Sequence, residues 1–411
     1  MNKTPSSSRV HIGFFGRRNA GKSSLVNAVT GQELAIVSEM KGTTTDPVYK
    51  AMELLPLGPV VIIDTPGIDD EGALGELRVL KAKQALNKTD VAVLVADASA
   101  VDARAGTEEK AERELIKLFQ EKQTPFIIAY NKSDIADRSV LDVLEKVKAE
   151  SHSICVSAKN KTNIDALKEK IATLAKMEEP KTRLVGDLIS PSDFVALVVP
   201  IDKAAPKGRL ILPQQQTIRD ILEADGTAIV VREYELRETL THLGKKPRLV
   251  ITDSQVFDKV SADTPPDIPL TSFSILFARY NGLLAVAVDG VQTLGALKDN
   301  DVVLICEGCT HHRQCDDIGT VKLPRWIRNH TGKRLEFTFT SGGDFPLDLS
   351  PYKLIVHCGG CMLNNREMRY RQKCAVDQKK PITNYGVLIA YIQGILKRCV
   401  AVFPAFRDIA C

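Results

Sequence analysis

The sequence has no long hydrophobic run: none of its apolar stretches approaches the roughly 18 residues that a membrane-spanning helix needs. Its first eleven residues, MNKTPSSSRVH, also lack the apolar core of a signal peptide. Charge of one sign is not in excess, because 55 basic and 51 acidic residues leave a net charge of only +4. We therefore expect a cytoplasmic protein that binds neither a membrane nor nucleic acid.

Cysteine is almost absent from the first 300 residues, where Cys155 is the only example, and eight more follow. In a cytoplasmic protein such a cluster favours metal ligands or redox groups over structural disulfides. The sequence shows no internal repeat of fixed period and no long low-complexity tract. Its length of 411 residues suggests about three domains.

The first part of the chain alternates short apolar runs with stretches that have a helical pattern. This alternation predicts an α/β fold with a parallel-rich sheet covered by helices. The pattern ends in turn-prone residues, so we place a first domain at residues 1–178, with residues 1–8 as a disordered tail. The expected strands are Val10 to Phe15, Val60 to Ile63, Val91 to Ala96, Pro125 to Tyr130 and Ser153 to Val156.

Two smaller α/β domains are expected to follow. One spans residues 179–264, with strands at 194–201, 228–232 and 249–252, and the proline-rich residues 264–269 read as a linker. The other spans residues 265–411. Its two apolar runs, Asp301 to Cys306 and Tyr352 to His357, are expected to be buried strands.

Residues Gly16 to Ser23 fit the pattern G-x-x-x-x-G-K-[ST] between an expected strand and an expected helix. Such a loop cradles phosphates with its backbone N–H groups, while the lysine reaches the β- and γ-phosphates and the hydroxyl binds magnesium. The candidate nucleotide-binding residues here are Gly16, Asn19, Ala20, Gly21, Lys22, Ser23 and Ser24.

A second motif, Asp64-Thr-Pro-Gly67, follows the next apolar strand. This position would place the Asp64 carboxylate near the magnesium ion and the Gly67 amide near the γ-phosphate. Thr43, Thr44 and Thr45 lie between the two motifs, where a loop that senses the γ-phosphate belongs. We expect Thr44 to contact the magnesium ion, although either neighbour fits as well.

Asn131-Lys132-Ser-Asp134 follows a further strand and indicates which base is bound. An aspartate at this position accepts from N1–H and the 2-amino group of guanine, which adenine cannot offer. Ser157-Ala158-Lys159 would add backbone donors to the guanine oxygen. The sequence therefore predicts a GTPase that binds GTP or GDP with Mg²⁺.

The residue after Gly67 is Ile68, where many GTPases place a glutamine that orients water. Hydrolysis is therefore expected to be slow or differently assisted. Asn19 and the segment Gly42-Thr-Thr-Thr-Asp46 resemble the potassium-stimulated GTPases of tRNA modification and ribosome assembly. That resemblance implies that Asn19 helps to bind K⁺; the plain alternative is a solvated loop asparagine.

The cysteines of the last domain include two groups that follow its expected strands: Cys309 with His311, and His357 with Cys358 and Cys361. Neighbouring parallel strands would bring both loops to one edge of a sheet. Thiolates select zinc, copper(I) or iron–sulfur clusters. From spacing alone, tetrahedral zinc and a 4Fe–4S cluster with one non-cysteine ligand are evenly matched.

The remaining cysteines of this domain are not expected to be metal ligands. Cys306 should be core, and Cys315, Cys374, Cys399 and Cys411 lack a paired spacing. The basic stretch from Arg366 to Lys373 should be a solvated helix face, and Val387 to Phe403 a core helix.

Taken together, G-R-R-N-A-G-K-S, G-T-T-T-D-P, D-T-P-G, N-K-S-D and S-A-K, followed by C-T-H and H-C-G-G-C, resemble the FeFe-hydrogenase maturation GTPases (HydF) over the whole chain. The specific part is the pairing of C-x-H with H-C-x-x-C behind a TrmE/Era-like, potassium-type GTPase domain. The resemblance implies a GTPase domain, a dimerisation domain and an iron–sulfur domain, in that order.

It further implies a homodimeric scaffold that holds a 4Fe–4S cluster through Cys309, Cys358 and Cys361, with His311 and His357 as candidate cluster or precursor ligands. Such a protein accepts a diiron precursor from radical-SAM maturases and delivers it to apo FeFe-hydrogenase. Two other readings stay open on the residues alone: a tRNA- or ribosome-associated GTPase with a structural zinc domain, and a redox-sensing GTPase.

Overall fold

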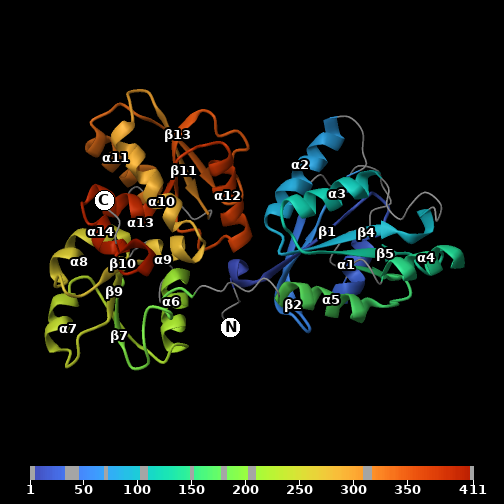
Figure 1. The fold of residues 1–411 in the computed structure, drawn as a ribbon, viewed down its shortest axis with the longest axis horizontal. Helices are drawn as coiled ribbons and strands as arrows, with labels where there is room; N and C mark the ends of the chain where they lie inside the picture. Colours follow the sequence, from blue (N-terminus) through green and yellow to red (C-terminus); the bar gives the residue numbers. More distant parts are fainter. Residues whose placement is uncertain are drawn as a thin grey trace. The chain divides into compact units, whose positions relative to one another are not determined.

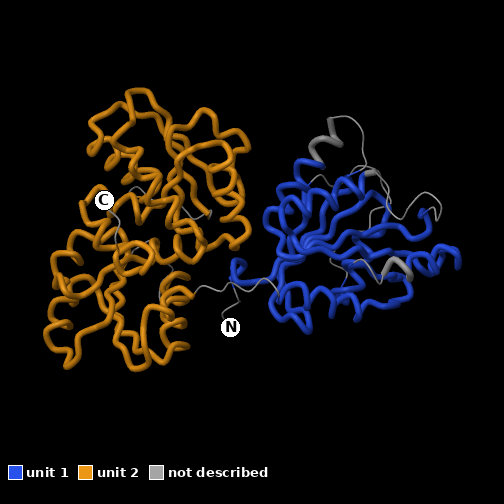
Figure 2. The backbone as a smooth tube through the Cα atoms, viewed as in Figure 1, with its two compact units in different colours: residues 1–179 blue, residues 180–411 orange. Residues whose placement is uncertain are grey.

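The computed structural model describes residues 5–32, 46–68, 73–101, 110–148, 152–176, 183–201, 210–308 and 317–407. The chain divides into two compact units, residues 1–179 and 180–411 (Figure 2). Each unit has its own hydrophobic cores.

Unit 1 is a six-stranded sheet with the order β2-β3-β1-β4-β5-β6, in which only the β2–β3 pair is antiparallel (Figure 1). This confirms the expected parallel-rich sheet. The strands are β1 (Val10–Gly16), β2 (Val48–Leu54), β3 (Gly58–Asp64), β4 (Val91–Asp97), β5 (Phe126–Asn131) and β6 (Ser153–Cys155), and the helices are α1 (Lys22–Thr30), α2 (Ala73–Asn87), α3 (Lys110–Glu121), α4 (Arg138–Lys148) and α5 (Ile164–Lys176).

Helices cover both faces of this sheet, because alternate residues of each central strand point to opposite sides. On β3, Val60 and Ile62 join the core beneath α1 and α5, whereas Val61 and Ile63 join the core beneath α2 and α3. Strand β2 was not expected from the sequence. It is an exposed edge strand and therefore has no continuous apolar run.

Unit 2 begins with a four-stranded parallel sheet of order β10-β9-β7-β8. Its strands are β7 (Phe194–Val198), β8 (Thr227–Val231), β9 (Leu249–Thr252) and β10 (Leu270–Ser272), with helices α6 (Leu212–Leu222), α7 (Leu236–His242), α8 (Phe257–Asp263) and α9 (Phe273–Tyr280). The expected linker at residues 264–269 lies inside this arrangement, between α8 and β10, instead of separating two domains.

A second parallel sheet follows, of order β12-β11-β13-β14. Its strands are β11 (Val302–Glu307), β12 (Glu336–Ser341), β13 (Tyr352–His357) and β14 (Ile382–Asn384), with helices α10 (Leu284–Val291), α11 (Leu323–Thr331), α12 (Asn365–Asp377), α13 (Tyr385–Ile392) and α14 (Leu396–Val400). The core helix expected from Val387 to Phe403 is thus two helices, α13 and α14.

The two sheets of unit 2 have the same topology. Numbered within each sheet, both have the strand order 4-3-1-2. The last strand of each leads directly into a helix that is capped by a side chain, Ser272 for α9 and Asn384 for α13. The two helix starts also contact each other, because the Gly386 N–H donates to Ser274 Oγ at 3.2 Å and Asn384 donates to the Ser274 carbonyl at 2.9 Å. One hydrophobic core contains residues of both sheets, so the two halves form one body.

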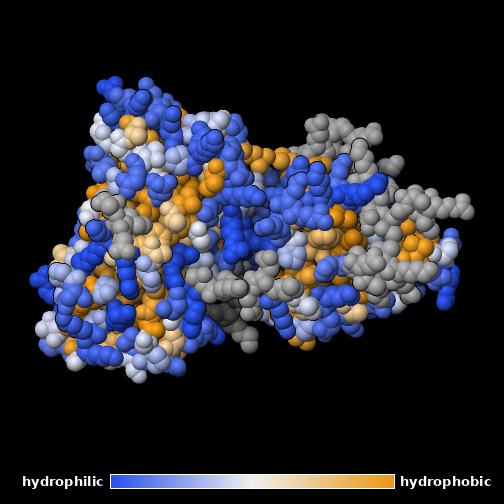
Figure 3. All heavy atoms as spheres, viewed as in Figure 1, coloured by the Kyte–Doolittle hydropathy of each residue, from blue (hydrophilic) through white to orange (hydrophobic). Residues whose placement is uncertain are grey.

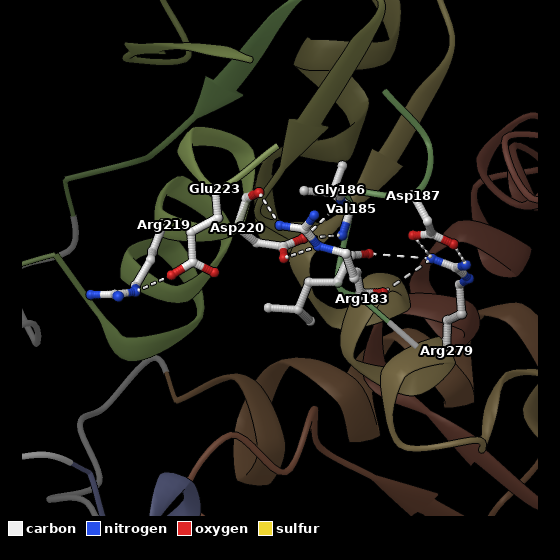
Figure 4. A network of polar contacts seen from close by, with 9 residues as sticks. Arg183, Val185, Gly186, Asp187, Arg219, Asp220, Glu223 and Arg279 are labelled. Atoms are coloured by element: carbon white, nitrogen blue, oxygen red, sulfur yellow. Dashed lines mark hydrogen bonds and ion pairs between the residues drawn. The ribbon is translucent and has the colours of Figure 1, made fainter. Parts of the chain in front are cut away.

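Charged side chains hold the first residues of unit 2 that the structure describes, 183–187 (Figure 4). The Asp220 carboxylate on α6 accepts hydrogen bonds from the backbone N–H groups of Val185 and Gly186, at 2.8 and 2.6 Å. It also accepts from the Arg183 guanidinium at 3.0 Å. One carboxylate therefore fixes the backbone of this segment against α6.

On the face drawn in Figure 3, hydrophilic side chains cover most of each unit, and hydrophobic ones form scattered patches. Within the described ranges, no single helix is both long and apolar enough to cross a membrane, although the bent pair formed by α9 with residues 284–296 meets the criteria of length and composition.

Candidate functional site

The phosphate loop lies between β1 and α1, as the sequence predicts. Its backbone is left-handed at Asn19 (φ 60°) and Gly21 (φ 85°), a turn that points successive N–H groups into a concavity. The Lys22 ammonium donates to the carbonyls of Gly16 and Arg17, at 3.1 and 2.7 Å. The Lys22 ammonium and the backbone N–H groups thus lie close enough together to bind the same β- or γ-phosphate.

Two of the residues expected at the magnesium ion, Ser23 and Asp64, are adjacent in space. Ser23 Oγ donates to Asp64 Oδ2 at 2.9 Å. Burial raises the pKa of Asp64, against the opposing effects of the Ser23 hydrogen bond and the Lys22 charge. The other oxygen, Asp64 Oδ1, is buried and has no hydrogen-bond partner among the described residues. A hydroxyl beside a buried carboxylate with a spare oxygen is a donor set that suits Mg²⁺.

Gly67 lies directly against the phosphate loop. A Cβ atom built on it would come within 2.8 Å of Arg18 Cα, so only glycine permits this approach of the two backbones. Ile68 is partly buried and packs against the core under α2 and α3. Thr43, Thr44 and Thr45 lie outside the described residues, so their expected roles stay predictions.

The base-recognition residues are assembled from the ends of β5 and β6. The Asn131 side chain donates to the Ala20 carbonyl at 3.2 Å and accepts from the Ala158 N–H at 3.0 Å, which joins this corner to the phosphate loop. Ser157 Oγ donates to Asp134 at 2.6 Å, and this hydrogen bond is the main cause of the lowered pKa of Asp134. The carboxylate is therefore ionised and oriented, as a hydrogen bond to guanine requires.

Lys132 completes this corner. Its backbone is left-handed, with φ at 63°, and its ammonium pairs with Asp97 at the end of β4, at 2.5 Å. Because the pair fixes the lysine stem, the loop that carries Asp134 is held at the carboxyl edge of the sheet.

In unit 2, strands β11 and β13 are parallel neighbours, with Cys306 opposite His357. After β11 the chain continues to β12 on one side of this pair, and after β13 it continues to β14 on the other side. Open α/β sheets bind ligands at the carboxyl ends of two strands related in this way. Cys358 and Cys361 follow β13 at this point. Cys309 and His311 follow β11 but lie outside the described residues, so their convergence with Cys358 stays a prediction.

Cys358 is held by its backbone and by its sulfur. Its N–H donates to the Cys306 carbonyl at 2.9 Å, and its Sγ accepts from the Gly308 and Gly360 N–H groups, at 3.0 and 3.4 Å. Gly360 has a left-handed backbone (φ 67°), and a Cβ there would meet Met368 Sδ at 2.5 Å. Amide donors to a cysteine sulfur in a glycine turn fit a metal-bound thiolate or an iron–sulfur cluster.

His357, expected as a candidate ligand, uses both ring nitrogens in contacts with the protein. The ring is fully buried, and both nitrogens are engaged: Nδ1 is 2.8 Å from the Cys358 carbonyl, and Nε2 is 3.0 Å from Arg371 Nη1. Burial, reinforced by the Arg371 charge, lowers the pKa of His357 to about 3. In this arrangement neither nitrogen offers a lone pair to a metal.

Arg371 also corrects an expectation. It belongs to the basic stretch of α12 that was expected to be a solvated face, yet its exposed fraction is 0% and it pairs with the buried Glu367 at 2.9 Å. The sequence pattern of this helix is misleading because its buried face itself carries charged residues.

Sequence reasoning missed one buried acidic residue near Cys358. Glu307, the last residue of β11, is buried, and the Tyr385 hydroxyl lies 3.4 Å from its Oε1 atom. Gly319 packs against both, since a Cβ there would come within 2.4 Å of Glu307. The sequence could have indicated Glu307, because it lies two residues before Cys309. It could not have indicated Tyr385, which reaches this place only because β14, the strand before it, pairs with β13.

The other cysteines that the structure describes in unit 2 are buried or partly buried. Cys306 and Cys399 are buried, and burial raises the pKa of each thiol to about 12. Cys374 is partly buried on α12. Cys315 and Cys411 lie outside the described residues. Among the residues that the structure describes, no group of three His, Cys, Asp or Glu side chains is placed to hold a metal ion.

Three family models match the chain. "50S ribosome-binding GTPase" matches residues 11–132, "Hydrogen maturase F dimerization domain" matches residues 184–282, and "Hydrogen maturase F tetramerization domain" matches residues 285–402. The last two models correspond to the two halves of unit 2, and they meet after α9.

Similar proteins in other organisms are GTPases. GTPase Der of Wolinella succinogenes is 35% identical over 40% of this chain and 35% of its own length. GTPase Era of Heliobacterium modesticaldum is 33% identical over 49% of this chain and 74% of its own length, and tRNA modification GTPase MnmE of Dichelobacter nodosus is 35% identical over 40% and 35%. The chain thus spans about a third of Der and MnmE and about three quarters of Era.

Among solved structures, Era of Aquifex aeolicus bound to GDP and aluminium fluoride covers 57% of this chain and 98% of its own, with 20% identity and a TM-score of 0.36.

Proposed function

Because this chain belongs to the hydrogen maturase F family, a group of TrmE/Era-like GTPases with extra domains, we propose that it is a scaffold for hydrogenase maturation. It binds a 4Fe–4S cluster in unit 2, accepts a diiron precursor as cargo from radical-SAM maturases, and delivers it to apo FeFe-hydrogenase. The protein acts in the cytoplasm as a homo-oligomer, at least a dimer.

The observation that carries this proposal is the parallel pairing of β11 with β13. The pairing makes the loop after each strand leave the same edge of the sheet. Cys358 and Cys361 follow one strand and Cys309 follows the other, so three thiolates can reach one cluster. A fourth, non-cysteine position would then be open to a ligand or to the precursor.

Unit 1 is a GTPase domain, and we propose a role for each of its motif residues. Lys22 and the Gly67 amide stabilise the γ-phosphate during attack by water. Mg²⁺ is held by Ser23 and Thr44, with Asp64 beside it, and Asn19 helps to hold K⁺, which supplies positive charge to the transition state. Because Ile68 cannot orient water, hydrolysis is slow and serves to time partner exchange.

Metal analysis of the whole chain tests the proposal. The protein is purified without oxygen and reconstituted, and iron, sulfide and zinc are measured per chain. We expect close to four irons and four sulfides, lost when Cys309, Cys358 and Cys361 are all changed to serine. About one zinc and no iron would overturn the proposal and favour a structural zinc domain.

A single change separates the two units. Cys358→Ser should abolish cluster binding and activation of apo-hydrogenase while GTP hydrolysis stays at the wild-type rate. Cys374→Ser, on α12 and away from the loop, is the matched control and should retain all three activities. Full hydrogenase activation by the Cys358→Ser protein would contradict the cluster site.

A further inference from the structure

Arg371 is the largest fully buried side chain in the described part of the protein, with an exposed fraction of 0%. A guanidinium ion removed from water is strongly unfavourable unless its donors are paired. Here they contact three different elements: Glu367 Oε1 at 2.9 Å on the same helix, the Gly342 carbonyl at 2.7 Å after β12, and His357 Nε2 at 3.0 Å at the end of β13. The guanidinium also lies over the Phe345 ring, 5.3 Å from its centroid.

The contact with His357 determines the state of the imidazole ring. A guanidinium only donates hydrogen bonds, so His357 Nε2 must be the acceptor and carry no proton. The ring proton is then on Nδ1, which donates to the Cys358 carbonyl at 2.8 Å. Arg371 therefore selects the tautomer that binds the cysteine backbone.

Cys358 is the end of this chain of contacts. Its carbonyl accepts from His357, and its N–H donates to Cys306 O at 2.9 Å. With both sides of the backbone fixed, the sulfur lies beneath the N–H groups of Gly308 and Gly360. Hydrogen bonds to the sulfurs are one of the factors that set the reduction potential of an iron–sulfur cluster.

We propose that Arg371, acting through His357, is a positioning residue that fixes the Cys358 thiolate and thereby sets the reduction potential and retention of the bound cluster. This inference rests on the proposed function, because it needs Cys358 to be a cluster ligand. Glu367 supports Arg371 in this role: one helical turn earlier on α12, its carboxylate pairs with the buried guanidinium and balances its charge.

The positioning role of Arg371 is tested with a variant that leaves no buried charge unpaired. In Glu367→Met/Arg371→Met, both partners are replaced by apolar side chains of similar length, a change that buried ion pairs often tolerate without loss of stability. Arg369→Met is the matched control, because Arg369 is exposed on the same helix. His357→Asn is the conservative variant, since the asparagine N–H₂ can replace the Nδ1–H group as donor to the Cys358 carbonyl.

In the reconstituted proteins, redox titration followed by EPR gives the cluster potential, and a chelator gives the rate of cluster loss. We expect the double variant to have a more negative potential, an altered EPR line shape and about tenfold faster cluster loss. Arg369→Met should match the wild type, and His357→Asn should lie between the two. A double variant with wild-type potential and cluster-loss rate would overturn the inference.

A measurement on the metal-free protein keeps the two proposals distinguishable. The rate at which iodoacetamide alkylates Cys358, followed by mass spectrometry, should rise severalfold in the double variant because its loop is no longer held. If the wild type binds no cluster, the proposed function fails, and this rate alone decides the positioning role. An unchanged rate would then overturn it.

Discussion

Ser157 Oγ donates a 2.6 Å hydrogen bond to the carboxylate of Asp134, although the two residues follow different strands of the sheet. The hydroxyl occupies one oxygen and leaves the rest of the carboxylate facing outward, since Asp134 is exposed. A carboxylate fixed in this way can discriminate between bases, because binding does not cost the free energy of ordering its side chain.

Asp134→Asn should therefore exchange the base preference. The amide replaces an acceptor by a donor, which clashes with guanine N1–H but pairs with the oxygen of xanthine. We expect GTP affinity to fall about 100-fold and xanthosine triphosphate to bind instead. Nucleotide titration of both proteins measures this change. Asp142→Asn, an exposed change on α4, should keep GTP selectivity, and unchanged selectivity in Asp134→Asn would refute the assignment.

Asn19→Gly should remove stimulation by potassium without distorting the phosphate loop. Asn19 has a left-handed backbone, which glycine adopts at no steric cost. The variant thus loses only the side-chain amide. We expect its GTP hydrolysis rate in KCl to fall to the rate in NaCl, while GTP binding in NaCl stays unchanged. Equal rates in KCl for variant and wild type would show that the asparagine is only a turn residue.

Asp220→Asn should destabilise unit 2. The Asp220 side chain is 14% exposed and accepts from two backbone N–H groups and Arg183, so losing its charge weakens three hydrogen bonds at once. We expect a loss of about 2 to 3 kcal/mol in the free energy of unfolding. The only tryptophan of the chain, Trp326, packs against the core of unit 2 and reports the urea transition.

Glu223→Gln is the matched control, at the C-terminal end of the same helix. The Glu223 side chain is 52% exposed and pairs with an Arg219 side chain that is 80% exposed (Figure 4). An exposed pair of this kind is worth about 0.5 kcal/mol or less. If both variants shift the urea midpoint equally, the anchoring role of Asp220 is wrong.

Cys399 should make unit 2 less stable at alkaline pH. Burial raises the pKa of its thiol from 9.0 to about 12 in the folded protein. The unfolded chain therefore loses this proton first, so the stabilisation is complete below pH 9 and decreases as pH rises from 9 toward 12. The slope approaches about 1.4 kcal/mol per pH unit.

Urea unfolding followed through Trp326 between pH 8 and 10 measures this slope, and Cys399→Ala should reduce it. The alanine variant is also less stable at every pH because of the cavity that it leaves. Only the difference in slope tests the prediction, and parallel curves for the two proteins would contradict it.

Most strands of unit 1 could be predicted because a parallel strand buried on both faces is a continuous apolar run, as Val91 to Ala96 illustrates. The phosphate loop, Asp64 and Asn131 could be placed for the same reason, since each lies at the end of such a strand. Strand β2 could not be predicted, because an exposed edge strand pairs through its backbone and needs no apolar pattern.

The same contrast holds in unit 2. The spacing of Cys358 and Cys361 identified their loop, and two apolar runs identified β11 and β13. The burial of Arg371 could not be predicted from its basic neighbours, because the exposure of a charged helix residue depends on what packs over it. The duplicated 4-3-1-2 topology was equally hidden, since strand order is a relationship among distant segments.

By itself, the sequence determined the chemistry: a loop for phosphates, an aspartate for guanine, and cysteines at the ends of two strands. Local spacing is enough for this, because each motif is recognised within a few consecutive residues. Only the tertiary structure decided which side chains support the chemistry. Hydrogen bonds between distant residues, such as Arg371 to His357 and Asn131 to Ala20, exist only once the strands have paired and the helices have packed.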